Sequence, residues 1–256
     1  MAGEEELLVG VVGTDTSEAV TELTAAGVRT RVDSPRAVLA ADPDVIAAVG
    51  ESGLLSLARQ HPETPVLPVD AGAGVRSIPT ARVEEATSRL HTEEWTTERH
   101  PLLAVDIGDT REYALFDAMA VTAEPAHISE FTVATGDERV ARFRADGVVV
   151  ATPAGTCGYA RDAGGPVVPP GSAVLAIVPV SPFATTLDHW VVPNDAVSIT
   201  VEREDATVDA LADDRTIGAA DVGEAIRLSA DGALDVLRVP EGRSPFDSRG
   251  AELEKL

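Results

Sequence analysis

Hydrophobic and polar residues follow one rhythm over the first part of the chain. Between Leu7 and His91, short apolar runs that predict buried strands alternate with amphipathic segments that predict helices. The first run ends in glycine, and the helical segment after it is followed by Gly27, a residue type that commonly ends helices. Strands and helices in turn predict a doubly wound, Rossmann-like parallel sheet. The expected strands are 7–13, 28–32, 44–50 and 65–72, and the expected helices are 16–26, 53–60, 79–91 and a short one from Ser34-Pro35.

The pattern changes at about Pro101. From there the chain consists of short β-rich runs, such as EYALFDAMAVTA and RVARFRADGVVVAT, which Gly, Pro, Asp and Asn separate at close spacing. No long helical pattern interrupts these runs, so we expect an all-β, sandwich-like second domain. The expected organisation is an α/β domain at 1–99, a β-rich domain at 100–240 and a helix-prone tail at 241–256.

Charge narrows the range of partners. The chain carries 43 acidic and 20 basic residues, which gives a net charge of −23. Lys255 is the only lysine, so nearly all the basic residues are arginine. A field this negative repels phosphate backbones and argues against a nucleic-acid partner. Because the acids are spread along the chain, they indicate a solvated acidic shell, typical of salt-loving archaea, rather than a cation-binding surface.

Other features exclude further classes of protein. No segment approaches the roughly 18 uninterrupted apolar residues of a membrane span. The acidic start MAGEEELLVG lacks the positive charge of a secretory signal, so we expect a cytoplasmic protein. The single cysteine, Cys157, excludes an intramolecular disulfide. The histidines lack the spacing of metal ligands, so no resident metal is expected.

The segment DGVVVATPAGTCGYARDAGGPVVPP, Asp146 to Pro170, carries the most distinctive chemistry. A valine-rich strand runs into hydroxyl side chains and flexible backbone. The hydroxyls of Thr152 and Thr156 can bind a ligand, and glycines let backbone N–H groups approach one closely. Tyr159 offers a ring suited to an aromatic base. An ordinary hairpin with turn glycines explains the spacing equally well.

This segment resembles the NAD kinase signature, in which D-G precedes an apolar strand, T-P-T-G-S-T-A-Y and a later G-G-P. The following stretch, AIVPVSPFATTLDHWVVP, is similar to the family's next strand and proline-bearing turn. The likeness extends from about Asp44 to Pro240. The residues that carry the signature are Asp146-Gly147, Thr152-Pro153, Gly155, Tyr159 and Gly164-Gly165-Pro166.

The phosphate turn departs from the family pattern. In the family a strand ends in G-G-D-G-T, whose backbone holds phosphate and whose aspartate acts on the acceptor hydroxyl. Here the strand is followed by Gly50-Glu51-Ser52-Gly53-Leu54. A strand, a glycine turn and a helix N-terminus still form an anion-binding geometry, so Gly50 and Gly53 are the expected phosphate-binding residues. Ser52 stands at the catalytic position, and a neutral hydroxyl is a poor proton acceptor.

Glu51 is the one nearby carboxylate that can replace the missing aspartate. Adjacent side chains at a strand end face opposite ways, so this hypothesis requires the turn to rotate. The alternative interpretation of Glu51 is a solvated carboxylate at a helix N-terminus, where the helix dipole favours it.

The resemblance also implies a set of NAD-binding residues. The family's asparagine and acid fall on Phe116-Asp117, and Phe116 cannot make the contacts of an amide. Cys157 replaces a threonine and Gly158 an alanine, while Arg215 takes the place of a glutamine. The expected NAD-binding residues are Asp117, His127, Arg144, Asp146, Thr152, Gly155, Thr156, Cys157, Gly158, Tyr159, Asp162 and Arg215.

Three functional hypotheses follow. The first is a kinase that transfers phosphate from Mg²⁺-bound ATP, or from polyphosphate, to the 2′-hydroxyl of NAD. The second is a non-catalytic NAD(P)-binding protein with a sensing or partner-subunit role, because Ser52 replaces the catalytic aspartate. The third is a kinase of another small-molecule alcohol. The resemblance further implies a homo-oligomer, either a dimer or a tetramer, that assembles through the second domain.

Overall fold

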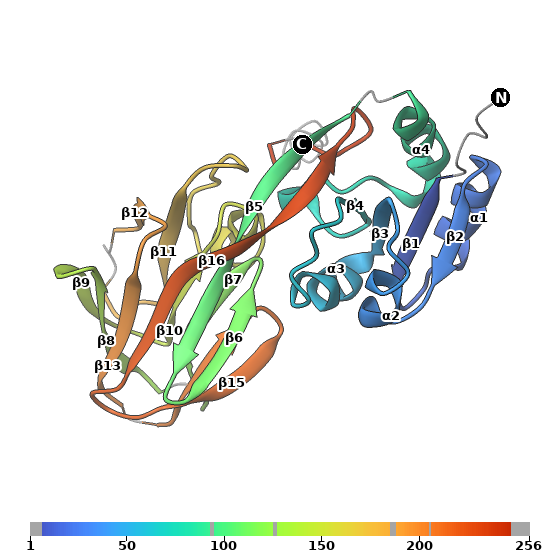
Figure 1. Ribbon diagram of the computed structural model, residues 1–256. Coiled ribbons are helices and arrows are strands. Elements are labelled where there is room, and N and C mark those ends of the chain that lie inside the picture. The colour runs from blue at the N-terminus through green and yellow to red at the C-terminus, as the bar shows by residue number, and fades with distance from the viewer. Residues whose placement is uncertain (1–6, 93–94, 125–126, 185–187, 205, 247–256) are drawn as a thin grey trace. The chain divides into compact units, whose positions relative to one another are not determined.

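The chain divides into two compact units in a computed structural model (Figure 1) that describes residues 7–92, 95–124, 127–184, 188–204 and 206–246. The first unit comprises residues 1–100 and 233–256, and the second comprises 101–232. The chain passes between them within β5 (Thr96–Ile107) and within β16 (Ala225–Arg238). Residues 233–240, which we expected in the second domain, thus lie in the first unit, because β16 continues into it.

The first unit is a doubly wound parallel sheet, as the sequence predicted. Its strands lie in the order β2-β1-β3-β4, and Val236 near the end of β16 adds to β4 in parallel, opposite Val66. The strands are β1 (Leu8–Gly13), β2 (Arg29–Val32), β3 (Val45–Val49) and β4 (Val66–Val69). The α-helices are α1 (Ser17–Ala25), α2 (Pro35–Leu39), α3 (Gly50–Ala58) and α4 (Val83–His91), with 3-10 turns at Ala73–Val75 and Thr80–Arg82.

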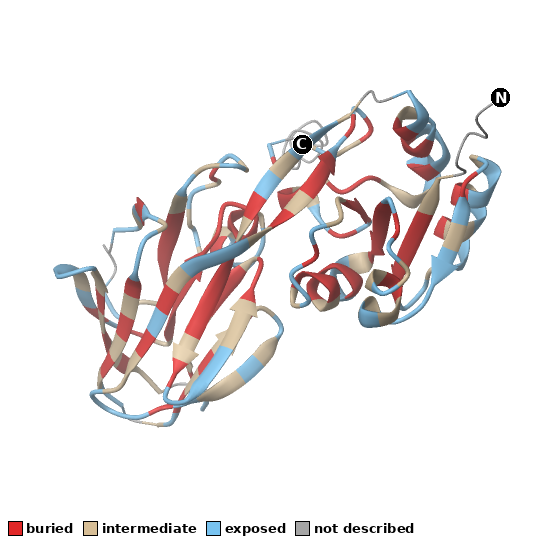
Figure 2. Ribbon diagram, in the orientation of Figure 1, coloured by how far each residue is buried: buried red, intermediate tan, exposed pale blue. Residues whose placement is uncertain are grey.

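Helices cover both faces of this sheet. On one face, Leu23 of α1 and Leu90 of α4 pack with Val11 and Leu67 of the strands. On the other face α2 approaches β1 closely, since a Cβ atom on Gly10 would overlap Val38. Figure 2 shows β1 and β3 buried and the edge strand β2 largely exposed. No helix among the described residues is long and apolar enough to cross a membrane.

The second unit is the expected β-sandwich. In one layer β16, β13, β8 and β9 pair in that order, and β5 pairs with β16 and β6. The other layer has the antiparallel order β12-β11-β10-β7-β14-β15. Phe131 and Ile199 of the first layer pack against Val148 and Ile177 of the second. The remaining bounds are β6 (Thr110–Ala114), β7 (Asp117–Thr122), β8 (Ser129–Thr135), β9 (Glu138–Ala145), β10 (Gly147–Ala151), β11 (Val174–Val180), β12 (Trp190–Pro193), β13 (Val197–Arg203), β14 (Val208–Ala212) and β15 (Arg215–Ala220).

A short helical segment interrupts the sandwich after β10. It consists of a 3-10 turn, Gly155–Cys157, and α5 (Tyr159–Asp162). Ala160 packs against Val149 and Val178, on the face of the second layer that points away from the sandwich core. The expected helix-prone tail lies outside the described residues from 247 onward.

A buried ion pair fixes the segment after β16 to α4. The Glu241 side chain is fully buried and accepts a 2.7 Å hydrogen bond from Arg89 Nε. Arg82 Nη2 lies 3.8 Å from the same carboxylate oxygen. Burial alone would raise the pKa of the Glu241 carboxyl, but the hydrogen bond and charge of Arg89 lower this pKa below its ordinary value of 4.5. The folded chain therefore favours the charged carboxylate.

We expect Glu241→Gln to lower the free energy of unfolding by about 1–3 kcal/mol, since it weakens a buried charge-assisted hydrogen bond. Glu85→Gln is the matched control, because Glu85 faces the same two arginines but is half exposed. Its effect should stay below about 1 kcal/mol. Denaturant unfolding in molar KCl measures both, and equal losses would contradict the assignment.

The same pair predicts a pH dependence. Because the carboxyl pKa is lowered on folding, the stabilisation is present above pH 4.5 and is lost as the pH falls through the lowered value. The stability of Glu241→Gln should therefore fall less steeply than that of the parent chain below pH 4.5. Unfolding curves at a series of acidic pH values test this difference.

Candidate functional site

The turn from β3 into α3 forms the phosphate-binding candidate of the first unit. Gly50 has a φ of +72° and redirects the chain at the end of the strand. The helix begins at Gly50 and not at Gly53, as the sequence pattern suggested, so Glu51 and Ser52 lie in its first turn. Both side chains are exposed, and no side chain caps the helix. Backbone N–H groups at this end are therefore available to an anion.

Gly53 sets how closely α3 approaches the sheet. A Cβ atom at this position would lie 2.8 Å from the carbonyl oxygen of Val12 and 3.0 Å from Gly13 Cα. Leu54, next along the helix, is fully buried. Its side chain packs in the interior, so the fifth motif position contributes nothing polar to the turn.

The early start of α3 changes the relation between Glu51 and Ser52. We expected their side chains to face opposite ways, as in a strand end. In a helix, successive side chains are about 100° apart, so both can border one space. Rotation of the turn, which the sequence argument required for Glu51, is unnecessary.

The loop after β4 lies at the same edge of the parallel sheet, because Val49 and Val69 are register partners. Asp70 has a φ of +49°, and its carboxylate accepts hydrogen bonds from the Thr80 amide (3.1 Å) and hydroxyl (2.6 Å). The Ser77 hydroxyl accepts a 2.7 Å bond from the Ala71 amide. These hydrogen bonds hold the loop after β4 in a fixed shape.

In the second unit, one carboxylate organises the start of β7. Asp213, in the turn between β14 and β15, accepts three backbone hydrogen bonds. The donors are the amides of Leu115 (2.8 Å), Phe116 (2.7 Å) and Asp117 (3.1 Å). Asp117 itself is 8% exposed. Sequence reasoning missed this role of Asp213, although a late family motif falls on Asp213-Asp214-Arg215.

The two signature threonines point inward. The Thr152 hydroxyl donates to the Leu115 carbonyl at 2.6 Å, and the Thr156 hydroxyl donates to the Pro153 carbonyl at 2.7 Å. Both side chains are buried. Their hydroxyls therefore position the loop, whereas we had expected them to be available to a ligand.

Gly155 packs directly against the turn before β7. A Cβ atom here would overlap the Phe116 carbonyl oxygen. The Thr152 amide donates to the same oxygen at 2.8 Å. The signature loop and the Phe116-Asp117 turn are thus one packed structure at the end of the second layer.

The next residues form the accessible edge of this loop. Gly158, Tyr159 and Asp162 are exposed, and Cys157 is partly exposed. The Tyr159 ring is 46% exposed, so it offers a surface on which a planar group can stack. Burial raises the pKa of the Cys157 thiol and the charge of Arg161 opposes this rise, so the thiol is neutral near pH 7.

Arg215 lies at the same end of the layer. It is the register partner of Ala212, and Ala212 pairs with Ala118 next to Asp117. Its Nη2 donates a 2.6 Å hydrogen bond to Glu112. The structure thus brings together the following predicted residues at one end of the second layer: Asp117, Thr152, Gly155, Thr156, Cys157, Gly158, Tyr159, Asp162 and Arg215.

A second group lies at the opposite end of β10. Asp146 directly precedes this strand, whose five residues span about 16 Å at 3.3 Å each. The guanidinium of Arg144 stands 5.6 Å from the centre of the exposed Phe183 ring. His127 lies just before β8, where its Nδ1 is 3.8 Å from Glu124. The predicted NAD-binding residues therefore form two separate groups.

We expect Gly155→Ala to lower the free energy of unfolding by about 3 kcal/mol or more, because the added methyl group overlaps backbone that cannot withdraw. Gly158→Ala is the matched control in the same loop, since its Cβ atom would meet nothing nearer than 3.5 Å. That change should cost less than about 1 kcal/mol. Thermal unfolding of both variants decides the matter, and a harmless Gly155→Ala would disprove the close approach.

Comparison with known proteins places these features in a family. The family model described as the ATP-NAD kinase C-terminal domain matches residues 115–239. Solved structures similar in fold include yeast NADH kinase in complex with NADH, with a TM-score of 0.77, 16% identity and coverage of 98% of this chain and 88% of that one. An NAD kinase from Archaeoglobus fulgidus in complex with ATP has a TM-score of 0.75 and 19% identity, over 98% and 99% of the two chains.

Curated relatives agree with this assignment. The NAD kinase of Methanothermobacter thermautotrophicus is 31% identical over 161 residues, which are 61% of this chain but only 57% of that protein, less than two thirds of its length. The NAD kinase of Methanosarcina barkeri is 30% identical over 210 residues, which are 79% of this chain and 71% of that protein. This similarity extends through both units, and on these grounds the chain belongs to the NAD kinase family.

Proposed function

We propose that this chain binds NAD and transfers a phosphoryl group from ATP, or from polyphosphate, to the 2′-hydroxyl of its ribose. One observation carries the proposal. The signature loop from Thr152 to Tyr159 is packed onto the Asp117 turn, so that its exposed edge presents backbone and an accessible ring. The relatives solved with NADH and with ATP support this choice of ligands.

Groups at this end of the second layer suit the two halves of the ligand. Tyr159 stacks on an aromatic base, and the Asp117 carboxylate accepts hydrogen bonds from ribose hydroxyls. Arg215 supplies positive charge near Asp117, although the Glu112 carboxylate partly neutralises that charge. In the first unit, the amides at the start of α3 hold the phosphates of the donor.

The transfer needs a proton acceptor. The 2′-oxygen forms a bond to the terminal phosphorus of the donor, the bond from that phosphorus to the bridging oxygen breaks, and ADP or a shortened polyphosphate leaves. The proton of the 2′-hydroxyl passes to a carboxylate. Glu51 is the carboxylate in the first turn of α3, beside the neutral Ser52.

A magnesium ion fits this donor set when it arrives with the nucleotide. Mg²⁺ is usually held by substrate phosphates and only one or two carboxylates. Among the described residues no group of three or more His, Cys, Asp or Glu side chains could hold a metal ion. The phosphates of the donor and water would hold the ion, which would neutralise charge on the transferred group and leave Glu51 to accept the proton.

The second candidate is a non-catalytic NAD(P)-binding protein. Ser52 and the buried Leu54 favour it, because they remove an acid and a hydroxyl from the phosphate turn, while the signature loop keeps Thr152, Gly155 and Tyr159. Such a protein would sense NAD(P) or pair with an active subunit.

We also propose that the chain forms a homo-oligomer, either a dimer or a tetramer. The two groups of predicted NAD-binding residues at opposite ends of β10 support this proposal. In an oligomer, one NAD site could contain one group of residues from one copy and the other group from a neighbouring copy. Light scattering of the purified protein in molar KCl tests it, and a monomer at all concentrations would refute it.

In a Glu51→Gln background, we expect Ser52→Asp to raise the rate of NADP formation about 10²–10⁴-fold, because a positioned carboxylate contributes this much as a general base. Ser52→Asn is the matched control, since it has the same size without the charge, and it should leave the rate unchanged. Formation of NADP from NAD and ATP with Mg²⁺ in molar KCl is the measurement. An equal response to both substitutions would refute the role of the charge.

Glu51→Gln separates the two candidates. If Glu51 accepts the proton in the parent chain, this variant should lose about 10²-fold or more in rate while its affinity for NAD by calorimetry stays the same. Binding without turnover in the parent chain selects the non-catalytic candidate. A parent chain that neither binds NAD nor forms NADP overturns both.

A further inference from the structure

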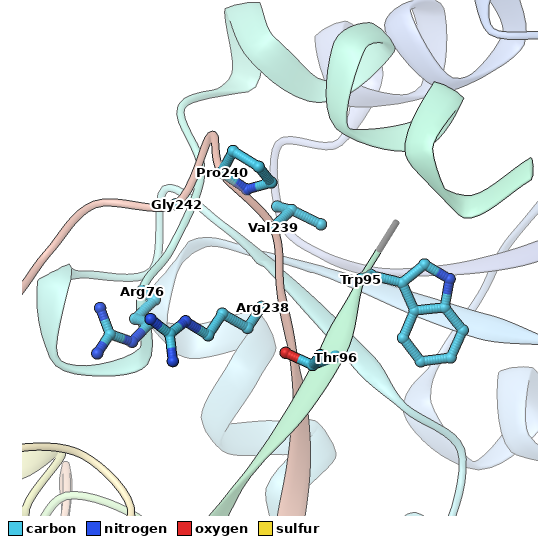
Figure 3. Close-up of a pocket in the computed structure, with 7 residues that line it drawn as sticks. All are labelled: Arg76, Trp95, Thr96, Arg238, Val239, Pro240 and Gly242. Atoms are coloured by element: carbon cyan, nitrogen blue, oxygen red, sulfur yellow. The ribbon is translucent and has the colours of Figure 1, made fainter. Parts of the chain in front are cut away.

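A pocket of about 580 Å³ lies in the first unit, outside the phosphate turn and the signature loop. Its volume is typical of small-molecule sites, which measure roughly 300–1,000 Å³. Figure 3 shows the side chains that border it. The lining residues are Arg76, Trp95, Thr96, Arg238, Val239, Pro240 and Gly242.

The two arginines come from neighbouring positions at one edge of the parallel sheet. Arg238 is the last residue of β16, and Arg76 belongs to the loop that follows β4. Because β16 and β4 run in parallel, Arg238 at the end of β16 and Arg76 beyond the end of β4 both lie on the carboxyl side of the sheet. Open α/β sheets bind their ligands at this edge.

Arg76 is fixed before any ligand arrives. Its backbone has a φ of +50°, and its amide donates to the Ala73 carbonyl at 3.0 Å. Its Nε donates to Glu98 at 3.2 Å, and both side chains are largely buried. A Cβ atom on Gly242 would lie 2.6 Å from the Arg76 carbonyl oxygen, so the two segments are tightly packed. One edge of the guanidinium is therefore anchored.

Glu98 keeps its charge in this setting. Its second oxygen lies 3.2 Å from Nε2 of the buried His100. Hydrogen bonding to His100 and the charges of His100 and Arg76 lower the pKa of the Glu98 carboxyl, although burial opposes them. Glu98 therefore stays charged and orients Arg76. Because the Arg76 side chain is already ordered, binding a ligand costs less side-chain entropy.

Arg238 has no such partner. Its side chain is exposed, and within the described parts of the chain it forms no hydrogen bond or ion pair. Figure 3 shows its guanidinium beside that of Arg76. Two adjacent cations repel each other unless an anion lies between them. In a chain with 43 acidic and only 20 basic residues, a cation to which the described residues supply no acid marks a place suited to an external anion.

We propose that this pocket binds an oligophosphate group, that is, two or more linked phosphates, through Arg76 and Arg238. Guanidinium groups bind phosphate oxygens with paired hydrogen bonds, and two of them side by side match a ligand with several negative charges. Thr96 also lines the pocket and carries a hydroxyl group. The site shares no residue with the phosphate turn, and it does not depend on whether phosphoryl transfer survives in this chain.

Fluorescence of Trp95 reports on the pocket directly. The chain has two tryptophans, and Trp190 stacks on Phe143 in the second unit. In a Trp190→Phe background, Trp95 is the only tryptophan and lines the pocket. Inorganic tripolyphosphate is the probe, added without NAD in KCl of fixed molar concentration. We expect saturable quenching of Trp95 with a matching heat in calorimetry.

Charge-neutral variants locate the bound phosphate. Arg238→Gln should weaken tripolyphosphate binding about ten- to a hundredfold, since it removes a charge-assisted contact. Arg99→Gln is the matched control, because Arg99 is an exposed arginine on the same strand as Thr96 and does not line the pocket. It should weaken binding less than about twofold. The double variant Arg76→Gln with Glu98→Gln removes a whole ion pair and should weaken binding as Arg238→Gln does.

Each other outcome overturns the proposal. The site does not exist if neither quenching nor heat is seen, and equal losses in Arg238→Gln and Arg99→Gln would indicate diffuse attraction only. Binding that Arg238→Gln leaves unchanged would place the phosphates elsewhere, for example at α3. A parallel titration with ATP identifies the source of the group. Competition with tripolyphosphate indicates a nucleotide, and tripolyphosphate binding alone indicates an inorganic chain.

Discussion

The close approach of Gly155 to the Phe116 carbonyl is the contact on which the second unit's binding surface depends. It brings the signature loop against the turn that starts β7. The amide and the hydroxyl of Thr152 donate hydrogen bonds to backbone carbonyls of that turn and so hold the two segments together. Asp213 binds the amides of that same turn from the neighbouring strand pair. With the interior side of the loop fully used in this way, only its outer edge is left to meet a ligand.

A close backbone contact at a glycine also occurs in the first unit. Gly53 lets the start of α3 lie against the end of β1, as Gly155 lets the loop lie against its turn. In both places the absent side chain permits a backbone contact that no other residue would allow. The amides of α3 are thereby held at the edge of the sheet, with Glu51 and Ser52 in the first turn of the helix. Under the proposed function, a serine at the position of the family's aspartate would alter the reaction chemistry without removing the scaffold.

Periodicity and glycine spacing were enough to predict the doubly wound sheet, the sandwich and the loops that carry the candidate site. They could not show that Thr152 and Thr156 turn inward, because a hydroxyl satisfies a backbone group as readily as a ligand. The start of α3 at Gly50 was also missed, since a glycine there looks like the end of a strand. Residues far apart in sequence were the hardest to relate. Nothing in the pattern connects Arg76 with Arg238, and only the return of β16 to the first sheet brings them to one pocket.

The net charge of −23 poses a problem for any protein that binds phosphates, because the whole surface repels them. Salt changes the balance between long-range and short-range forces. At molar ionic strength, charges more than about 3 Å apart in solvent are largely screened, so the acidic shell no longer repels an approaching nucleotide. Contacts within a partly enclosed site are screened much less. In the proposed sites, the amides of α3 and the guanidiniums of Arg76 and Arg238 would act at that range. An acidic chain can therefore bind anions in concentrated salt with few cations, provided that these cations act within a partly enclosed site.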